Sequence, residues 1–162
     1  MKKILISACL LGERVRYDGA SKKREEECLR RWQKEGRLVL HCPEVSGGLA
    51  VPRAPAEIVG GSGEEVWAGE AKVETKEGRD LTAAYQAGAM AALELVRREG
   101  IEIAILKARS PSCGSKQIYD GSHQGVLREG EGVTVTLLRR EGVAVYSEED
   151  LEEVERLLEA ER

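Results

Sequence analysis

A chain of 162 residues has room for one domain with its own hydrophobic core, and we expect a single domain over residues 1–162. The hydrophobic share of 41% and the charged share of 33% are typical of a soluble globular protein. The net charge of −4, spread over interspersed acidic and basic residues, speaks against a nucleic-acid-binding surface. No apolar run reaches the roughly 20 residues of a membrane span, so no membrane partner is expected.

The N-terminal segment is predicted to be a buried strand over Lys3–Cys9 rather than a signal peptide. Its apolar run is interrupted by Ser7 and is followed by the charged residues Glu13 and Arg14. We therefore expect a cytoplasmic protein. In that compartment, cysteines more often bind metal or take part in catalysis than form disulfides.

Hydrophobic periodicity and turn residues then predict alternating helices and strands. The elements are, in chain order, a loop over Leu10–Ser21, a helix over Ser21–Gly36 with Ser21 as its N-cap, a strand over Arg37–His41, a long structured loop over Pro43–Gly63, a strand over Ala71–Thr75, a helix from Asp80 or Thr82 to about Glu99, a strand over Ile101–Lys107, a short helix or turn over Val133–Glu141, a strand over Val143–Tyr146 and a helix over Ser147–Ala160 capped by Ser147 and Asp150. This order predicts a three-layer α/β sandwich with a mostly parallel central sheet, Rossmann-like in arrangement.

Three of the four cysteines come at the ends of predicted strands. Cys9 ends the first strand, Cys42 follows the second, and Cys113 lies in the serine-rich loop after the central strand. The carboxyl ends of parallel strands share one edge of the sheet, where open α/β sheets bind ligands, so we expect these thiols to converge there. Cys28 lies on the apolar face of the first long helix and is expected in the core.

Three converging thiolates fit two kinds of metal site. One is an iron–sulfur cluster with an open iron, and the other is a zinc ion completed by water or by His41. His41 is a poor fourth ligand, because it neighbours Cys42 in a strand and successive side chains point to opposite faces. Taken singly, each cysteine is also compatible with a small buried hydrophobic residue.

Three sequence blocks resemble the signature blocks of a known family. They are SACLLGERVRYDG at Ser7–Gly19, CPEVSGGLAVPR at Cys42–Arg53 and LKARSPSCGSKQIYDG at Leu106–Gly121. In this order they resemble the bacterial family that contains 2-thiouracil desulfidase. The stretch DLTAAYQAGA at Asp80–Ala89 and the segment Gly130–Leu151 match in order and spacing too, so the resemblance covers nearly the whole chain.

The resemblance implies a [4Fe–4S] cluster held by Cys9, Cys42 and Cys113, with one iron left open to accept sulfur. It implies an enzyme that replaces the sulfur of a small thiolated substrate, such as 2-thiouracil, by oxygen and releases sulfide. It also implies that Glu44 is a catalytic acid/base and that Ser110 is a second catalytic residue. Because this exchange is formally hydrolytic, no redox cofactor is required.

Other interpretations of these residues stay open at this stage. Without the resemblance, Glu44 would be a loop carboxylate that caps backbone N–H groups. Ser112 competes with Ser110, although a turn-forming hydroxyl is the simpler role for it. Lys107 either supplies charge at the sheet edge or forms an exposed salt bridge. Three further residues are candidates to shape the pocket: Arg14, Asp18 and Arg53. Alternatively, Arg53 forms an ion pair with Glu57, four residues on.

A different class of function also fits the cysteines. In this alternative the protein is a zinc- or thiol-based binding module without desulfidase activity, which uses Cys9, Cys42 and Cys113, with or without His41. Its colour separates the two hypotheses, since an iron–sulfur protein is brown and a zinc protein is colourless.

Overall fold

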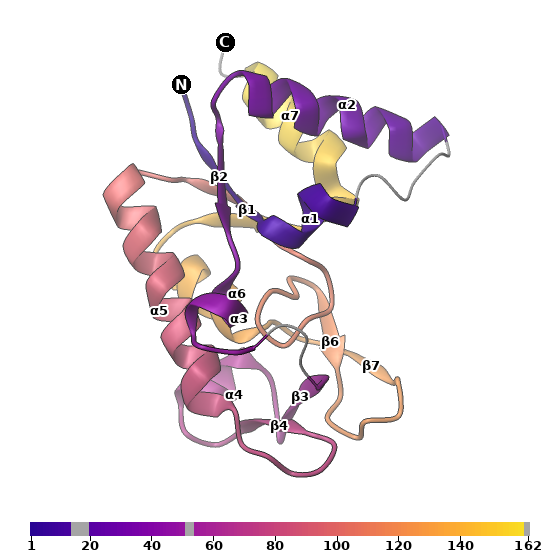
Figure 1. Cartoon of the computed structure of the whole chain (residues 1–162), viewed down its shortest axis with the longest axis vertical. Coiled ribbons are helices and arrows are strands. Elements are labelled where there is room, and N and C mark those ends of the chain that lie inside the picture. Colours follow the sequence, from indigo (N-terminus) through magenta and orange to yellow (C-terminus); the bar gives the residue numbers. More distant parts are fainter. Residues whose placement is uncertain (14–19, 51–53, 161–162) are drawn as a thin grey trace.

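The computed structural model describes residues 1–13, 20–50 and 54–160. At its centre lies a parallel four-stranded sheet with the strand order β2-β1-β5-β8 (Figure 1). The strands are β1 (Ile4–Ser7), β2 (Leu38–His41), β5 (Ile103–Ile105) and β8 (Ala144–Tyr146). The carboxyl ends of β1, β2 and β5 therefore lie next to one another along one edge.

Helices cover both faces of this sheet. They are α2 (Ala20–Lys34) and α7 (Leu151–Ala160) on one face, and α5 (Thr82–Glu99) and α6 (Val133–Arg140) on the other. Alternate residues of β1 serve the two faces: Ile4 and Ile6 pack with Trp32 of α2, whereas Leu5 packs with Leu138 of α6. This arrangement confirms the predicted α/β class with a parallel central sheet between helical layers.

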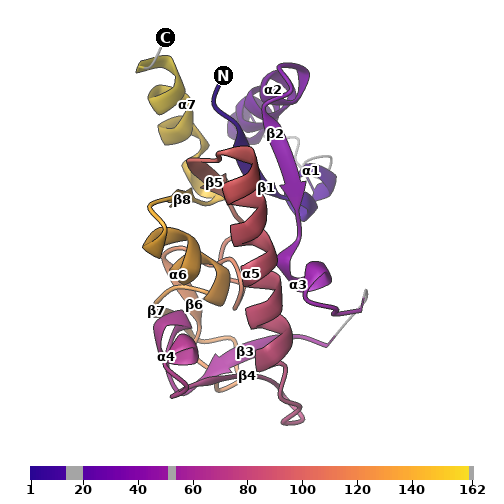
Figure 2. The same ribbon diagram turned by 90° about the vertical axis from the view of Figure 1, so that its left-hand side faces the viewer.

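A second group of elements lies below the carboxyl edge of the sheet (Figure 1). It contains two antiparallel pairs and a short helix: β3 (Ala56–Val59) with β4 (Lys72–Thr75), β6 (Gln117–Tyr119) with β7 (Leu127–Glu129), and α4 (Gly63–Trp67). The long helix α5 runs from the sheet down to this group and joins the two (Figure 2). Its Tyr85 and Ala89 pack with Ile58, Val73 and Ile118 of the small sheets.

Several predicted elements need correction. Cys9 does not end a strand, because β1 stops at Ser7 and Cys9 lies in the helix α1 (Ala8–Glu13). The expected loop over residues 43–63 contains α3 (Pro43–Ser46), β3 and the start of α4. Ser21 lies inside α2 rather than at its N-cap. The short elements α1, α3, β3 and α4 lack the repeated apolar spacing that marks a long helix, and tertiary contacts stabilise them.

Three other predicted features are present in the structure. The strand predicted at residues 71–75 exists, but it pairs with β3 outside the central sheet. Cys28 is buried with Leu29 and Trp32, as expected. The Ser147–Asp150 capping box is formed at a 3₁₀ turn, η2 (Glu148–Asp150), that leads into α7. Within the described part of the chain, no helix is long and apolar enough to cross a bilayer.

Candidate active site

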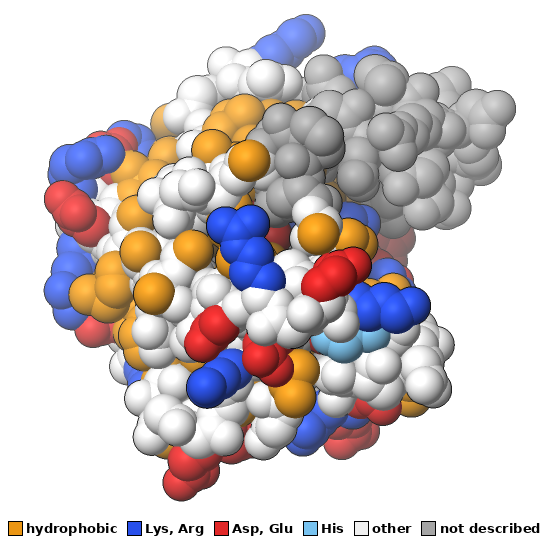
Figure 3. All heavy atoms as spheres, turned by 60° about the horizontal axis from the view of Figure 1, so that its bottom comes forward, with side chains coloured by type: hydrophobic (Ala, Val, Ile, Leu, Met, Phe, Trp, Pro, Cys, Tyr) orange, Lys and Arg blue, Asp and Glu red, His pale blue; other side chains and the backbone are white. Residues whose placement is uncertain are grey.

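A pocket of about 790 Å³ lies at the carboxyl edge of the central sheet. Its walls come from α3, α5, β3, the loop after β5 and the end of β6. Both predicted catalytic residues, Glu44 and Ser110, line it. The surface on this lower side carries acidic and basic side chains next to one another rather than a field of one sign (Figure 3). The pocket is therefore suited to a small molecule rather than to a nucleic-acid backbone.

Three cysteines follow the three neighbouring strands at this edge. Cys9 is exposed in the first turn of α1, directly after β1. Cys42 is half-buried at the N-cap of α3, directly after β2. Cys113 is 3% exposed and lies in the loop after β5. Their common role as cluster ligands stays a prediction, and their placement at adjacent strand ends is compatible with it.

The three cysteines are candidate ligands for a zinc ion or for an iron–sulfur cluster. Among the described residues, no three His, Cys, Asp or Glu side chains are grouped so as to hold a single metal ion. The thiolates of a [4Fe–4S] cube bind separate irons at its corners, so they lie farther apart than the ligands of one ion. Cys9, Cys42 and Cys113 would hold such a cluster with one open iron, whereas Cys28 is packed in the core with Leu29 and Trp32.

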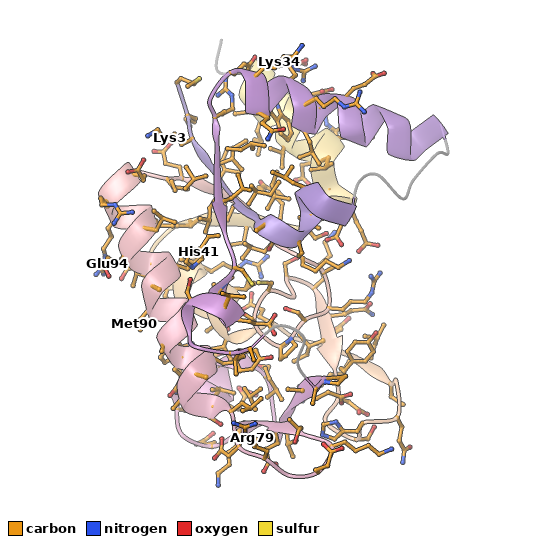
Figure 4. All side chains as sticks on the ribbon, in the orientation of Figure 1. Lys3, Lys34, His41, Arg79, Met90 and Glu94 are labelled. Atoms are coloured by element: carbon orange, nitrogen blue, oxygen red, sulfur yellow. The ribbon has the colours of Figure 1, made fainter. Side chains whose placement is uncertain are left out.

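His41 lies at the end of β2 beside α5 (Figure 4). Its ring is half-buried, and its Nε2 has no hydrogen-bond partner in the described part of the chain. Burial lowers the pKa of His41, although the backbone of Gly88 opposes the shift. The imidazole is therefore neutral at physiological pH.

The loop that carries Cys113 is fixed by its own hydrogen bonds. The Ser110 Oγ accepts the backbone N–H of Cys113 at 2.7 Å. The carbonyl groups of Pro111 and Ser112 accept N–H groups from the first two residues of α6, which would otherwise lack partners at the start of that helix. The Ser112 hydroxyl is fully buried and shares a 2.7 Å hydrogen bond with Thr134. This contact gives Ser112 a structural role and leaves Ser110 as the serine that lines the pocket.

The environment of the Cys113 thiol keeps it protonated. Burial raises its pKa to about 12, and the nearby Glu44 carboxylate adds to the rise, whereas hydrogen bonds from Ser112, Ser7 and Ser110 oppose it. The Ser7 hydroxyl, at the end of β1, lies 3.9 Å from the Cys113 sulfur. Iron binds the thiolate form, so cluster loading has to displace this proton.

Glu44 is placed by both α3 and α5. It stands in the single turn of α3, next to Pro43 at the helix start. Its Oε2 accepts a hydrogen bond from the Tyr85 hydroxyl at 2.7 Å. Tyr85 belongs to the block at residues 80–89 that matched the family, but the sequence assigned it no role. Membership of that block was the only feature of the sequence that could have indicated a role for Tyr85.

Lys107 and the residue after it are held by Glu148 of η2. The Lys107 ammonium lies 2.7 Å from one carboxylate oxygen of Glu148, and the other oxygen accepts the N–H of Ala108 at 2.8 Å. The salt-bridge interpretation of Lys107 is thus confirmed, although its side chain also lines the pocket. Arg109 follows with a positive φ of 72°, unusual for a residue with a side chain, and pairs with Glu149 at 3.0 Å.

The opposite wall is held by Glu57 of β3. Its Oε1 accepts the N–H groups of Gly121 (2.9 Å) and His123 (3.2 Å), in the loop between β6 and β7. That loop and the strand before it contribute Gly125 and Tyr119 to the pocket. The remaining three pocket candidates from the sequence, Arg14, Asp18 and Arg53, lie outside the described residues.

Comparison with known proteins tests the resemblance. Residues 4–150 match the family model described as 2-thiouracil desulfurase. The chain belongs to the 2-thiouracil desulfurase family. It is 42% identical over 151 residues to the Bacillus subtilis (strain 168) protein YbbK, which is described as uncharacterized, and the match covers 93% of this chain and 99% of YbbK.

A solved structure is similar over nearly the whole length of both proteins. It is that of TudS, described as a [4Fe-4S]-dependent thiouracil desulfidase, with 41% sequence identity and a TM-score of 0.81. The match covers 99% of each chain. The central sheet, the two small sheets and the pocket between them therefore lie within a fold shared with a desulfidase. The family resemblance inferred from the sequence blocks is confirmed.

Proposed function

We propose that this protein is a [4Fe–4S]-dependent desulfidase that acts on a small thiolated base such as 2-thiouracil. The observation that carries the proposal is the pocket at the sheet edge, where Glu44 and Ser110 line one cavity beside the loop of Cys113. Family membership and the likeness to a [4Fe-4S]-dependent thiouracil desulfidase over 99% of the chain support the same activity.

The overall reaction balances without electron transfer. The C=S group and one water become C=O and hydrogen sulfide, so two carbon–sulfur bonds are replaced by two carbon–oxygen bonds and both protons of water end on sulfur. Bound to Cys9, Cys42 and Cys113, the cluster would supply an open, thiophilic iron for the soft thiocarbonyl sulfur.

The protein's own groups would handle water and protons. Glu44 takes a proton from the attacking water and returns it as sulfur leaves, the role of a general base and then a general acid. Ser110 donates a hydrogen bond to the substrate while its oxygen holds the N–H of Cys113. Both groups line the same cavity, so one bound base can contact both of them.

The test is made on protein purified and reconstituted without oxygen. We expect a brown protein with iron and acid-labile sulfide in a cubane ratio, which releases sulfide from 2-thiouracil and forms uracil at the same rate. 4-Thiouracil and other thiolated pyrimidines are assayed in parallel, with iron-free protein as the control.

Two results would contradict parts of the proposal. Brown protein that releases no sulfide from any thiolated base would remove the substrate class and leave the cluster. Colourless protein with stoichiometric zinc would favour the zinc-based binding module instead.

A further inference from the structure

Tyr85 is the buried side chain of α5 that reaches the pocket. It is 2% exposed, and its ring packs in the cluster formed by α5 and the two small sheets. Its hydroxyl donates to Glu44 Oε2 at 2.7 Å. A buried tyrosine hydroxyl needs a hydrogen-bond partner, and here that partner is the carboxylate expected to perform the chemistry.

The helix that carries Glu44 cannot fix this carboxylate by itself. α3 has four residues, so a single turn determines where the side chain starts. A glutamate also has three rotatable side-chain bonds, and holding it in one position costs conformational entropy. An external hydrogen bond from a rigid group lowers that mobility. The Tyr85 ring, enclosed by its apolar neighbours, is such a group.

The packing of α3 on α5 fixes the distance between Tyr85 and Glu44. A methyl group on Gly88 would lie 1.8 Å from the carbonyl oxygen of Pro43, and one on Gly47 would lie 2.0 Å from that of Ala84. The two backbones are therefore in direct contact. Gly88 stands three residues after Tyr85, on the same side of α5. One face of α5 thus holds both the backbone and the carboxylate of the Glu44 segment.

We propose that Tyr85 is a positioning residue for Glu44, which holds the carboxylate in the orientation needed for catalysis. This inference rests on the proposed desulfidase function. It also gives the family block at residues 80–89 a role, because that block supplies the hydroxyl and the glycine that together place Glu44.

The test compares Tyr85→Phe with Tyr146→Phe. Both changes remove one hydroxyl, but Tyr146 lies on β8, outside the pocket. In reconstituted Tyr85→Phe we expect an unchanged iron content and visible spectrum. We expect kcat to fall about 10- to 100-fold with KM changed by less than about threefold, since misplacing a catalytic group slows the chemical step more than it weakens binding. The control should keep the wild-type kcat.

A second readout needs no activity. In cluster-free protein, the urea midpoints of wild type, Tyr85→Phe, Glu44→Ala and the double variant form a cycle. We expect the double variant to lose less unfolding free energy than the sum of the two single losses, because both single changes break the same hydrogen bond.

The outcomes separate the two proposals. If wild-type protein forms its cluster but desulfurates nothing, the proposed function fails and the urea cycle alone decides whether Tyr85 holds Glu44. If wild-type protein is active and Tyr85→Phe retains its kcat, the positioning role is wrong. Strict additivity in the cycle would overturn it as well, and so would a loss of iron in Tyr85→Phe, which would reveal a structural effect on the cluster.

Discussion

The carbonyl oxygen of Pro43 and the Cα of Gly88 are in such close contact that a methyl group on Gly88 would lie 1.8 Å from this oxygen. Pro43 stands between Cys42, a predicted cluster ligand, and Glu44, the predicted acid/base. The contact therefore sets the position of both predicted site residues through one backbone segment. No side chain larger than hydrogen fits at Gly88 without moving α3.

Gly88→Ala should consequently destabilise the protein, although alanine is the better helix former. The propensity gain is about 1 kcal/mol, whereas forcing a methyl group against a rigid backbone costs about 3 kcal/mol. We expect a net loss of about 2 kcal/mol in urea unfolding and a lower iron content after reconstitution. Ala87→Ser, on the exposed side of the same helix, is the matched control. Unchanged stability and iron in Gly88→Ala would show that α3 does not depend on this contact.

The four cysteines should separate into two classes. Serine at Cys9, Cys42 or Cys113 should abolish cluster retention, because two thiolates do not hold the cube firmly. Cys28 lies on the face of α2 that packs on α7, and its thiol donates a hydrogen bond to Glu155. Cys28→Ala should retain the cluster at a cost of roughly 1 kcal/mol in stability. Iron analysis and the visible spectrum measure both. A bleached Cys28→Ala beside a brown Cys9→Ser would reverse the assignment of the ligands.

Glu44→Gln should keep the brown colour and lose most of its turnover. It removes proton transfer but preserves the size of the side chain, so we expect kcat to fall about 100-fold or more while iron stays at the wild-type level. Steady-state sulfide release beside iron analysis gives both quantities. Loss of iron in this variant would point to a role of Glu44 in holding the cluster.

Ser110→Ala should show a mixed effect that the sequence alone did not suggest. A similar loss of turnover is expected, but the hydroxyl also accepts the N–H of Cys113. Leaving this donor without a partner costs about 1–3 kcal/mol, so the variant should unfold at lower urea. Ser110→Thr keeps the hydroxyl and should restore stability more fully than activity. Equal stability of the alanine and wild-type proteins would argue against this hydrogen bond.

Removal of the cluster should reveal different reactivities among the cysteines. In reduced, cluster-free protein near neutral pH, iodoacetamide should alkylate the exposed Cys9 first and Cys113 far more slowly. Burial raises the pKa of Cys113 to about 12, which lowers its thiolate fraction, and it also blocks access. Mass spectrometry of peptides taken at successive times measures the order in which the cysteines are alkylated. In urea-unfolded protein the difference between Cys9 and Cys113 should disappear. Rapid modification of Cys113 in the folded protein would contradict the buried environment.

Much of the fold was predictable because its long elements carry periodic patterns. The α5 helix and the apolar segment that forms β5 were located from their spacing, and the parallel sheet followed from their alternation. Of the strands in the small antiparallel sheets, only β4 was predicted. β6 and β7 have three residues each, and all three residues of β7 are exposed. Strands this short show no distinct alternation, and pairing rather than local propensity defines them.

The sequence by itself determined the family, the cysteines that follow strands and the buried place of Cys28, since these depend on residue identity and local periodicity. Only the tertiary structure decided that β1 lies between β2 and β5, and that Tyr85 meets Glu44. Apolar spacing tells which face of an element is buried but not which element covers it. The contact between Tyr85 and Glu44 arises when α3 packs on α5 without intervening side chains. This close approach depends on Gly47 and Gly88, and a sequence does not show which glycines allow two backbones to meet.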